Sequence, residues 1–129
     1  QFRLRGFQKA FKRFLRIICL SRLIVYLALL ERLKEAFPNI KPIMIEPFLL
    51  YGSDKVNMLE ELDEKIRIER ALAQEYADAY LPMQAIFAAE TLRTPYTEFS
   101  GDGVHPNAGG AGFIAQKVLD TIEPLMADL

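Results

Sequence analysis

The feature that most constrains this fold is a short, unbroken apolar run followed by a long amphipathic helix pattern. The run covers residues 43–45, at the centre of an expected strand over 42–48, and the helix pattern covers 58–80. A half-exposed strand alternates apolar and polar residues, whereas a strand covered on both faces is continuously apolar. A second apolar segment, over 81–87, is expected to form another strand that runs into a turn or helix at 88–90. This strand–helix–strand order predicts the α/β class with a parallel sheet.

Two more helices are expected on either side of this alternation. One continues to Phe37, where Pro38 and Asn39 provide ordinary helix termination. The other covers residues 108–127 and has Asn107 as its N-cap. The apolar residues expected to face the core from the 58–80 and 108–127 helices are Leu59, Leu62, Ile66, Ala73, Tyr76, Tyr80, Phe113, Val118, Ile122 and Leu125.

Length and composition exclude several classes of protein. The 129 residues are enough for one domain with a modest core. Cys19 is the only cysteine, which excludes an internal disulfide, and with a single histidine the chain lacks the ligands that a structural zinc site prefers. The sequence has no Asp-x-Asp-x-Asp loop typical of calcium sites. We therefore expect neither a metal nor a cofactor.

The near-neutral net charge hides an asymmetry along the chain. Residues 1–34 contain nine Lys/Arg and one Glu, a charge of +8, whereas residues 35–129 contain seven Lys/Arg and sixteen Asp/Glu, a charge of −9. Within residues 1–27, basic positions alternate with Phe7, Phe11 and Phe14 at helical spacing, so a basic amphipathic helix is predicted. Such a helix packs on its own domain or lies on a membrane surface.

The targeting signals in this N-terminal part are weak. Residues 17–30 are nearly apolar, but the stretch is too short to span a bilayer and contains Arg22. No small-residue cleavage site of the kind that ends a signal peptide follows it. Together with the single cysteine, these features predict a cytoplasmic location.

The candidate chemistry lies in the loop from Gly101 to Asn107. This loop contains the only histidine, His105, three positions after Asp102. A carboxylate that accepts a hydrogen bond from one imidazole nitrogen fixes the tautomer and leaves the other nitrogen free as a base. Gly103 allows left-handed backbone angles between the two residues, and Pro106 stiffens the exit. An Asx-turn beside a surface imidazole, with no chemistry, is the alternative that the spacing leaves open.

The run Asp102-Gly103-Val104-His105-Pro106, followed by small residues and Phe113-Ile114-Ala115, resembles the last signature block of the SGNH (GDSL) hydrolases. The resemblance extends over roughly residues 28–127 and includes the segments 30–48 and 70–90. It implies a serine esterase or lipase with a three-layer α/β/α, flavodoxin-like parallel sheet that is incomplete on its N-terminal side. It also divides the chain into residues 1–27, which do not match the family, and residues 28–129, which do. A truncation, a recombined end or a shifted reading frame would each produce this pattern.

The same resemblance implies roles for two residues only. His105 would be the general base and Asp102 the carboxylate that orients it. The family's nucleophilic serine lies in a Gly-Asp-Ser motif, and none of the three serines here, Ser21, Ser53 and Ser100, lies in one. A Gly-x-Ser-x-Gly elbow is also absent from the sequence. The nucleophile and the oxyanion donors are therefore not assigned to any residue of this chain.

Two functional hypotheses follow. The first is the C-terminal part of an SGNH-type carboxylic-ester hydrolase that acts on a small ester, such as an acylated carbohydrate or a short acyl ester. The alternative is a non-catalytic α/β module that binds a membrane surface or a partner protein through its basic N-terminal helix; this reading is the less favoured. No nucleic-acid partner is predicted, because the basic segment carries no recognised motif and the rest of the chain is acidic. The sequence is compatible with a homo-oligomer.

Overall fold

The structure, a computed structural model, describes residues 21–127. The chain divides into two compact units, Gln1–Ile40 and Lys41–Leu129. Most of the basic amphipathic segment predicted over residues 1–27 lies outside the described residues. The predicted boundary between residues 27 and 28 concerns family resemblance rather than compactness, and it stays a prediction.

The first unit contains a helix over residues 21–36. This helix ends where the sequence predicts, because Pro38 cannot continue a helix and the Phe37 amide makes the last helical bond, to the Leu33 carbonyl at 2.9 Å. The Ile40 amide then donates to the Phe37 carbonyl at 3.0 Å and closes a turn. Within residues 21–127, no helix is both long enough and apolar enough to cross a bilayer.

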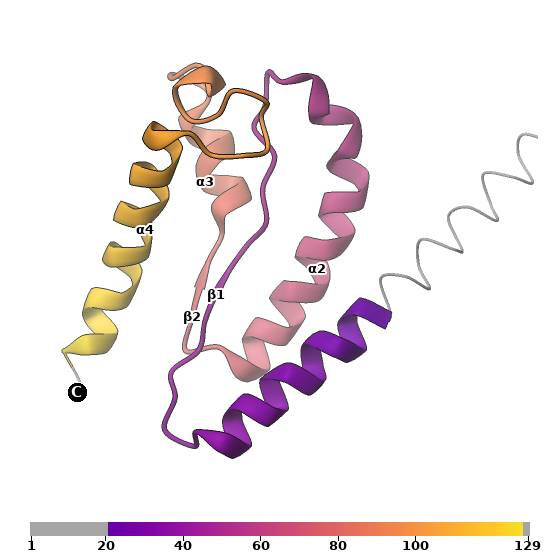
Figure 1. Cartoon of the computed structure of the whole chain (residues 1–129), viewed down its shortest axis with the longest axis vertical. Helices are drawn as coiled ribbons and strands as arrows, with labels where there is room; N and C mark the ends of the chain where they lie inside the picture. Colours follow the sequence, from indigo (N-terminus) through magenta and orange to yellow (C-terminus); the bar gives the residue numbers. More distant parts are fainter. Residues whose placement is uncertain (1–20, 128–129) are drawn as a thin grey trace, which may run out of the picture. The chain divides into compact units, whose positions relative to one another are not determined.

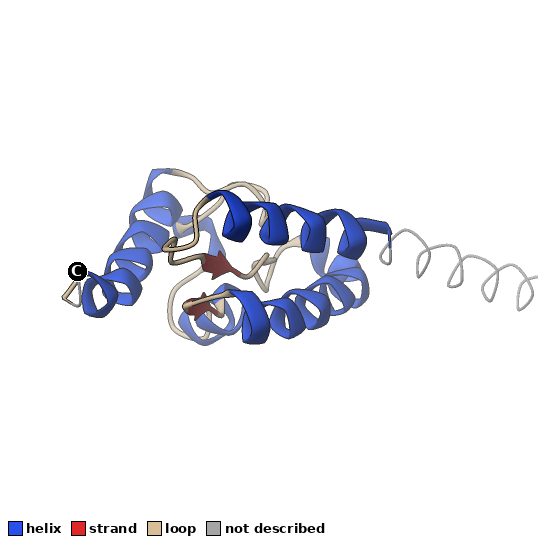
Figure 2. Ribbon diagram, turned by 90° about the horizontal axis from the view of Figure 1, so that it is seen from below, coloured by secondary structure: helices blue, strands red, loops and turns tan. Residues whose placement is uncertain are grey.

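The second unit is a small α/β assembly around a two-stranded parallel sheet. Strand β1 (Ile43–Ile45) pairs with β2 (Ala79–Leu81), and Met44 lies opposite Tyr80. Helix α2 (Leu59–Tyr76) connects them, and α3 (Met83–Glu90) and α4 (Ala108–Met126) follow β2. Two short 3-10 helices, η1 (Asp54–Met58) and η2 (Tyr96–Glu98), lie in the connections. Figures 1 and 2 show α2 and α4 on opposite faces of the two strands.

The core of the second unit has two parts, one packed against α4 and the other against α2. Towards α4, the buried cluster is Leu50, Leu81, Met83, Phe87 and Phe99, with Phe113, Ile114 and Val118 packed against it. The Phe87 ring lies 5.5 Å from the Phe99 ring and 5.2 Å from the Phe113 ring, measured between centroids. Towards α2, Leu62 and Ile66 pack with Leu49. The predicted inward faces are therefore confirmed at Leu62 and Ile66 of α2 and at Phe113 and Val118 of α4.

The structure corrects the predicted elements at three places. Helix α2 ends at Tyr76, so Tyr80 belongs to β2 and not to the helix stripe. Residues 83–87, predicted as part of a strand, form most of α3. Strand β1 ends at Ile45, so residues 46–48, predicted as the end of the first strand, lie outside it. Helix α2 ends earlier than predicted because of a tertiary contact. Ala77 turns to extended angles, and the Asp78 amide donates to the Pro42 carbonyl at 2.8 Å, which begins the pairing with β1.

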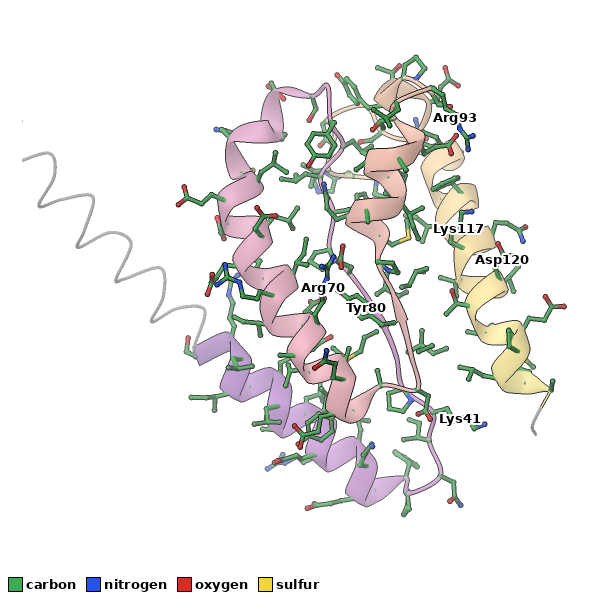
Figure 3. The ribbon with its side chains drawn as sticks, turned by 180° about the vertical axis from the view of Figure 1, so that it is seen from behind. Lys41, Arg70, Tyr80, Arg93, Lys117 and Asp120 are labelled. Atoms are coloured by element: carbon green, nitrogen blue, oxygen red, sulfur yellow. The ribbon has the colours of Figure 1, made fainter. Side chains whose placement is uncertain are left out.

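A buried carboxylate joins both strands to α2. Glu46, which follows β1, is 1% exposed, and its Oε2 accepts hydrogen bonds from the Tyr80 hydroxyl at 2.5 Å and from Nε and Nη2 of Arg70 at 3.0 Å each. Its Oε1 accepts a hydrogen bond from the backbone amide of Gln84 at 3.2 Å. Figure 3 shows Arg70 and Tyr80 close together on α2 and β2. Burial and the bond to Glu46 raise the pKa of the Tyr80 hydroxyl, which therefore stays a donor.

Candidate active site

The loop that carries Asp102 and His105 lies between η2 and α4 and is closed by backbone bonds at its base. Ser100 and Pro106 form an isolated antiparallel bridge, and the Asn107 amide donates to the Phe99 carbonyl at 2.9 Å. The Asn107 side chain then caps α4, because its Oδ1 accepts from the Gly110 amide at 3.0 Å. The predicted N-cap is thus confirmed. Residues 101–105 project from this base as a tight bend.

The structure brings Asp102 and His105 together within that bend. Nδ1 of His105 lies 2.6 Å from Oδ2 of Asp102. The other carboxylate oxygen, Oδ1, accepts from the Val104 amide at 2.9 Å and from the His105 amide at 2.8 Å. Because an ionised carboxylate can only accept, Nδ1 carries the proton of the 2.6 Å bond. The same geometry places Nε2 on the side of the ring that faces away from Asp102.

These contacts determine the charge state of the pair. The hydrogen bond from the His105 ring, followed by the backbone donors of His105 and Val104, holds the pKa of the Asp102 carboxyl well below its usual range. Asp102 is therefore ionised at any pH at which the protein would act. The side chains are 84% exposed for His105 and 46% exposed for Asp102, so the imidazole is open to a reactant from outside.

Gly103 fixes the bend through its backbone conformation and its close contacts. Its φ is +84°, the left-handed region that the sequence predicts for it. The Leu50 amide donates to the Gly103 carbonyl at 2.9 Å, which ties this bend to the loop after β1 (Figure 1). A Cβ on Gly103 would collide with the side chain of Ser53 in that loop. The site loop and the loop after β1 are therefore packed at van der Waals distance.

Sequence reasoning missed the part played by Ser100. This serine is 0% exposed, and its Oγ lies 2.6 Å from the His105 carbonyl oxygen and 2.9 Å from the Gly103 amide nitrogen. Ser53 is buried as well, and its hydroxyl donates to the Leu50 carbonyl at 2.8 Å. Neither hydroxyl is therefore presented to solvent as a nucleophile would be. A lone serine two positions before an aspartate carries no sequence signal that would have revealed this.

No set of three or more His, Cys, Asp or Glu side chains between residues 21 and 127 is arranged to hold a metal ion. The predicted site residues that the structure brings together are Asp102 and His105. Their catalytic roles are not tested by this geometry and stay predictions.

Comparison with known proteins gives one informative match. No protein-family model and no curated protein matches this sequence. A crystal structure from Parabacteroides merdae ATCC 43184, of a protein described provisionally as a GDSL-like lipase, superposes with a TM-score of 0.65 at 30% sequence identity. The match covers 72% of this chain and 44% of that protein, so the chain spans less than half the length of this relative. The predicted resemblance is therefore confirmed: this chain is similar, in sequence and in structure, to part of a GDSL-like lipase.

Proposed function

We propose that this chain supplies the Asp–His part of an SGNH-type serine hydrolase that cleaves carboxylic esters. The observation that carries the proposal is the 2.6 Å contact between Nδ1 of His105 and Oδ2 of Asp102, on an imidazole whose side chain is 84% exposed. The similarity to a GDSL-like lipase supports it, because the Asp-x-x-His block of this chain resembles the closing block of that family.

In the proposed reaction, Nε2 of His105 takes the proton of a serine hydroxyl as that oxygen attacks the ester carbonyl. Asp102 keeps the proton of the ring on Nδ1 and stabilises the imidazolium that forms. The imidazolium then gives its proton to the leaving alcohol, and water repeats the cycle on the acyl-enzyme. The serine and the oxyanion donors come from a polypeptide segment other than residues 21–127.

The same proposal extends to the sheet and the substrate. The two parallel strands are part of a larger parallel sheet with helices on both faces, which fits the placement of α2 and α4 (Figure 2). The substrate is a small ester, such as a short acyl ester or an acylated carbohydrate.

A chimera tests the catalytic role of His105. Residues 41–127 would replace the matching part of the Parabacteroides merdae lipase, and hydrolysis of p-nitrophenyl butyrate would be measured. We expect turnover in the chimera and a loss of about a thousandfold or more in kcat/KM on His105→Ala, because the general base is removed. Leu92→Ala, at a side chain that is 88% exposed, is the matched surface control and is expected to leave turnover unchanged.

A second chimera with only residues 100–107 exchanged guards against loss of folding in the larger graft. If the unmodified lipase hydrolyses the ester and folded chimeras hydrolyse it equally well with and without His105, the proposal is wrong. Labelling of the chain itself with a fluorophosphonate probe gives an independent check. We expect no adduct on Ser53 or Ser100, whereas an adduct lost on His105→Ala would place the nucleophile within this chain.

A further inference from the structure

The Asp102 and His105 side chains are in contact although neither of them is buried. The two side chains are 46% and 84% exposed, so burial does not hold them in place. An exposed side chain keeps a single geometry only when local hydrogen bonds offset the rotamer entropy that it loses. The hydrogen bonds of the loop itself therefore have to hold this contact.

Two of the loop's hydrogen bonds end on Asp102 Oδ1, and several others converge on the hydroxyl of Ser100. Its Oγ lies 2.6 Å from the His105 carbonyl oxygen, 2.9 Å from the Gly103 amide nitrogen, 3.3 Å from the Asp102 amide nitrogen and 3.1 Å from Asp102 Oδ1. A hydroxyl has one proton and two lone pairs. The shorter distance assigns the proton to the His105 carbonyl, and the two amides then donate to the lone pairs.

We propose that Ser100 is a positioning residue, whose buried hydroxyl fixes the backbone bend that places the Asp102 carboxylate against the His105 imidazole. The hydroxyl holds the loop at three points, since it binds the backbone of Asp102, Gly103 and His105. It is 0% exposed, so water cannot replace any of these bonds without opening the loop. The consequence for catalysis rests on the proposed function, but the effect on the imidazole does not.

The alternative is that Ser100 only stabilises the folded loop and has no effect on the pair. The tautomer of the His105 imidazole distinguishes the positioning role of Ser100 from a purely structural role. His105 is the only histidine of the chain, so the imidazole signals of a ¹⁵N spectrum belong to one residue. The bond to Asp102 favours the Nδ1–H form of the neutral ring, and a displaced carboxylate would allow the Nε2–H form.

The experiment measures the ratio of Nδ1–H to Nε2–H by long-range ¹H–¹⁵N correlation on the whole chain, at a pH at which the ring is neutral. The variants are Ser100→Ala, Ser100→Cys, which is slightly larger and provides only a weak donor, and Ser100→Thr, which keeps the hydroxyl. Thr91→Ala is the control, because it removes a hydroxyl that bonds the Phe87 carbonyl at 2.8 Å at the end of α3, outside both the site loop and the loop after β1.

We expect the Nδ1–H to Nε2–H ratio to fall about tenfold in the Ala and Cys variants, the effect of losing roughly one buried hydrogen bond. The Ser100→Thr variant should recover most of the ratio, and Thr91→Ala should leave it unchanged. An unchanged ratio in folded Ala and Cys variants would overturn the proposal. So would unfolding of both variants, since Ser100 would then support the whole fold rather than the pair.

The same outcomes keep this inference separate from the proposed function. If the chimeras hydrolyse no ester but Ser100→Cys still shifts the tautomer, the hydrolase proposal fails and the positioning role of Ser100 stands. If the chimeras are active and Ser100→Cys leaves both the tautomer and kcat unchanged, the positioning role fails alone.

Discussion

Asp102 uses its two carboxylate oxygens for different purposes. Oδ1 accepts the amides of Val104 and His105 and so belongs to the backbone of the bend. Within this loop, Oδ2 contacts only the imidazole, at 2.6 Å from Nδ1 of His105. One residue therefore builds the turn and orients the ring, which is why a three-residue spacing suffices to form the pair.

The different partners of the two carboxylate oxygens predict the effect of Asp102→Asn. The amide oxygen can still accept the two backbone donors, so the bend should survive. The amide nitrogen, however, is a donor and cannot accept from Nδ1, so the ring should change to the Nε2–H tautomer. We expect the ¹⁵N spectrum of the chain to show this change and kcat of the active chimera to fall about a thousandfold or more.

The comparison for Asp102→Asn is the unsubstituted chain at the same pH. Retention of the Nδ1–H form together with full turnover would contradict the assigned role of Asp102. Loss of turnover with an unchanged tautomer would show that the carboxylate acts through charge and not through orientation of the ring.

At the scale of residues, prediction from sequence succeeded where the interacting groups are near neighbours. Asp102 and His105 lie three positions apart, and a glycine between them allows the bend that joins them. Ser100 was not predicted, because a serine forms local hydrogen bonds in many loops and its type alone does not show which.

The site loop and the loop after β1 act as one element, because Gly103 joins them. Its carbonyl accepts from Leu50, and its Cα lies against Ser53 without room for a Cβ. The bend that carries the Asp–His pair is therefore supported by a segment 50 residues earlier in the chain. Any change that pushes the two loops apart should affect the pair.

Gly103→Ala tests this contact. The substitution places a side chain at a φ of +84° and against Ser53, and we expect it to lower the free energy of unfolding by about 2 kcal/mol. Urea denaturation followed by circular dichroism measures the change. Gly101→Ala is the matched control, since a Cβ there would meet no atom within 4 Å, and it should alter stability by about 0.5 kcal/mol or less. Equal effects of the two substitutions would refute the close packing of the loops.

Elements were predicted well where one chemical signal decides their ends and poorly where tertiary pairing decides. Asn107 and Pro38 are strong local signals, and both boundaries are confirmed. Ala77 and Asp78 carry no such signal, so the sequence predicted a helix through Tyr80. Pairing of Ala79 with Ile43 ends the helix instead, a long-range contact that local propensity does not contain.

At the scale of the whole second unit, Glu46 is the polar centre of the fold. Its carboxylate receives bonds from Arg70 on α2, Tyr80 on β2 and the Gln84 amide at the start of α3. These partners lie 24 to 38 residues away in the sequence. No pattern in a single sequence relates positions so distant, so this network could not be predicted. A buried carboxylate that lost these donors would be strongly destabilising, which ties the strands and α2 into one cooperative structure.

Glu69, on α2 beside this network, gives the unit a pH-dependent stability. Its Oε2 is buried, and no hydrogen-bond partner is found for it among the described residues. Burial, and secondarily the charge of Glu46, raise the pKa of the Glu69 carboxyl from 4.5 to about 7. Between these two values the folded state binds a proton that the unfolded state does not bind. The contribution of Glu69 to the free energy of unfolding is therefore complete below pH 4.5 and is lost as the pH rises to about 7.

Glu69→Gln should remove this dependence, because the amide mimics the protonated carboxyl at every pH. We expect the variant and the unsubstituted chain to be equally stable near pH 4, and the variant to be more stable by about 1 kcal/mol at pH 8. The full linkage value is reduced because Glu69 is only partly buried and solvent screens its charge. Urea denaturation at intervals between the two pH values measures the difference. Glu75→Gln, at an exposed carboxylate of the same helix, is the matched control and should show no comparable change. A variant less stable than the unsubstituted chain at pH 8 would mean that the Glu69 carboxylate is satisfied when charged, and would reverse the assigned role.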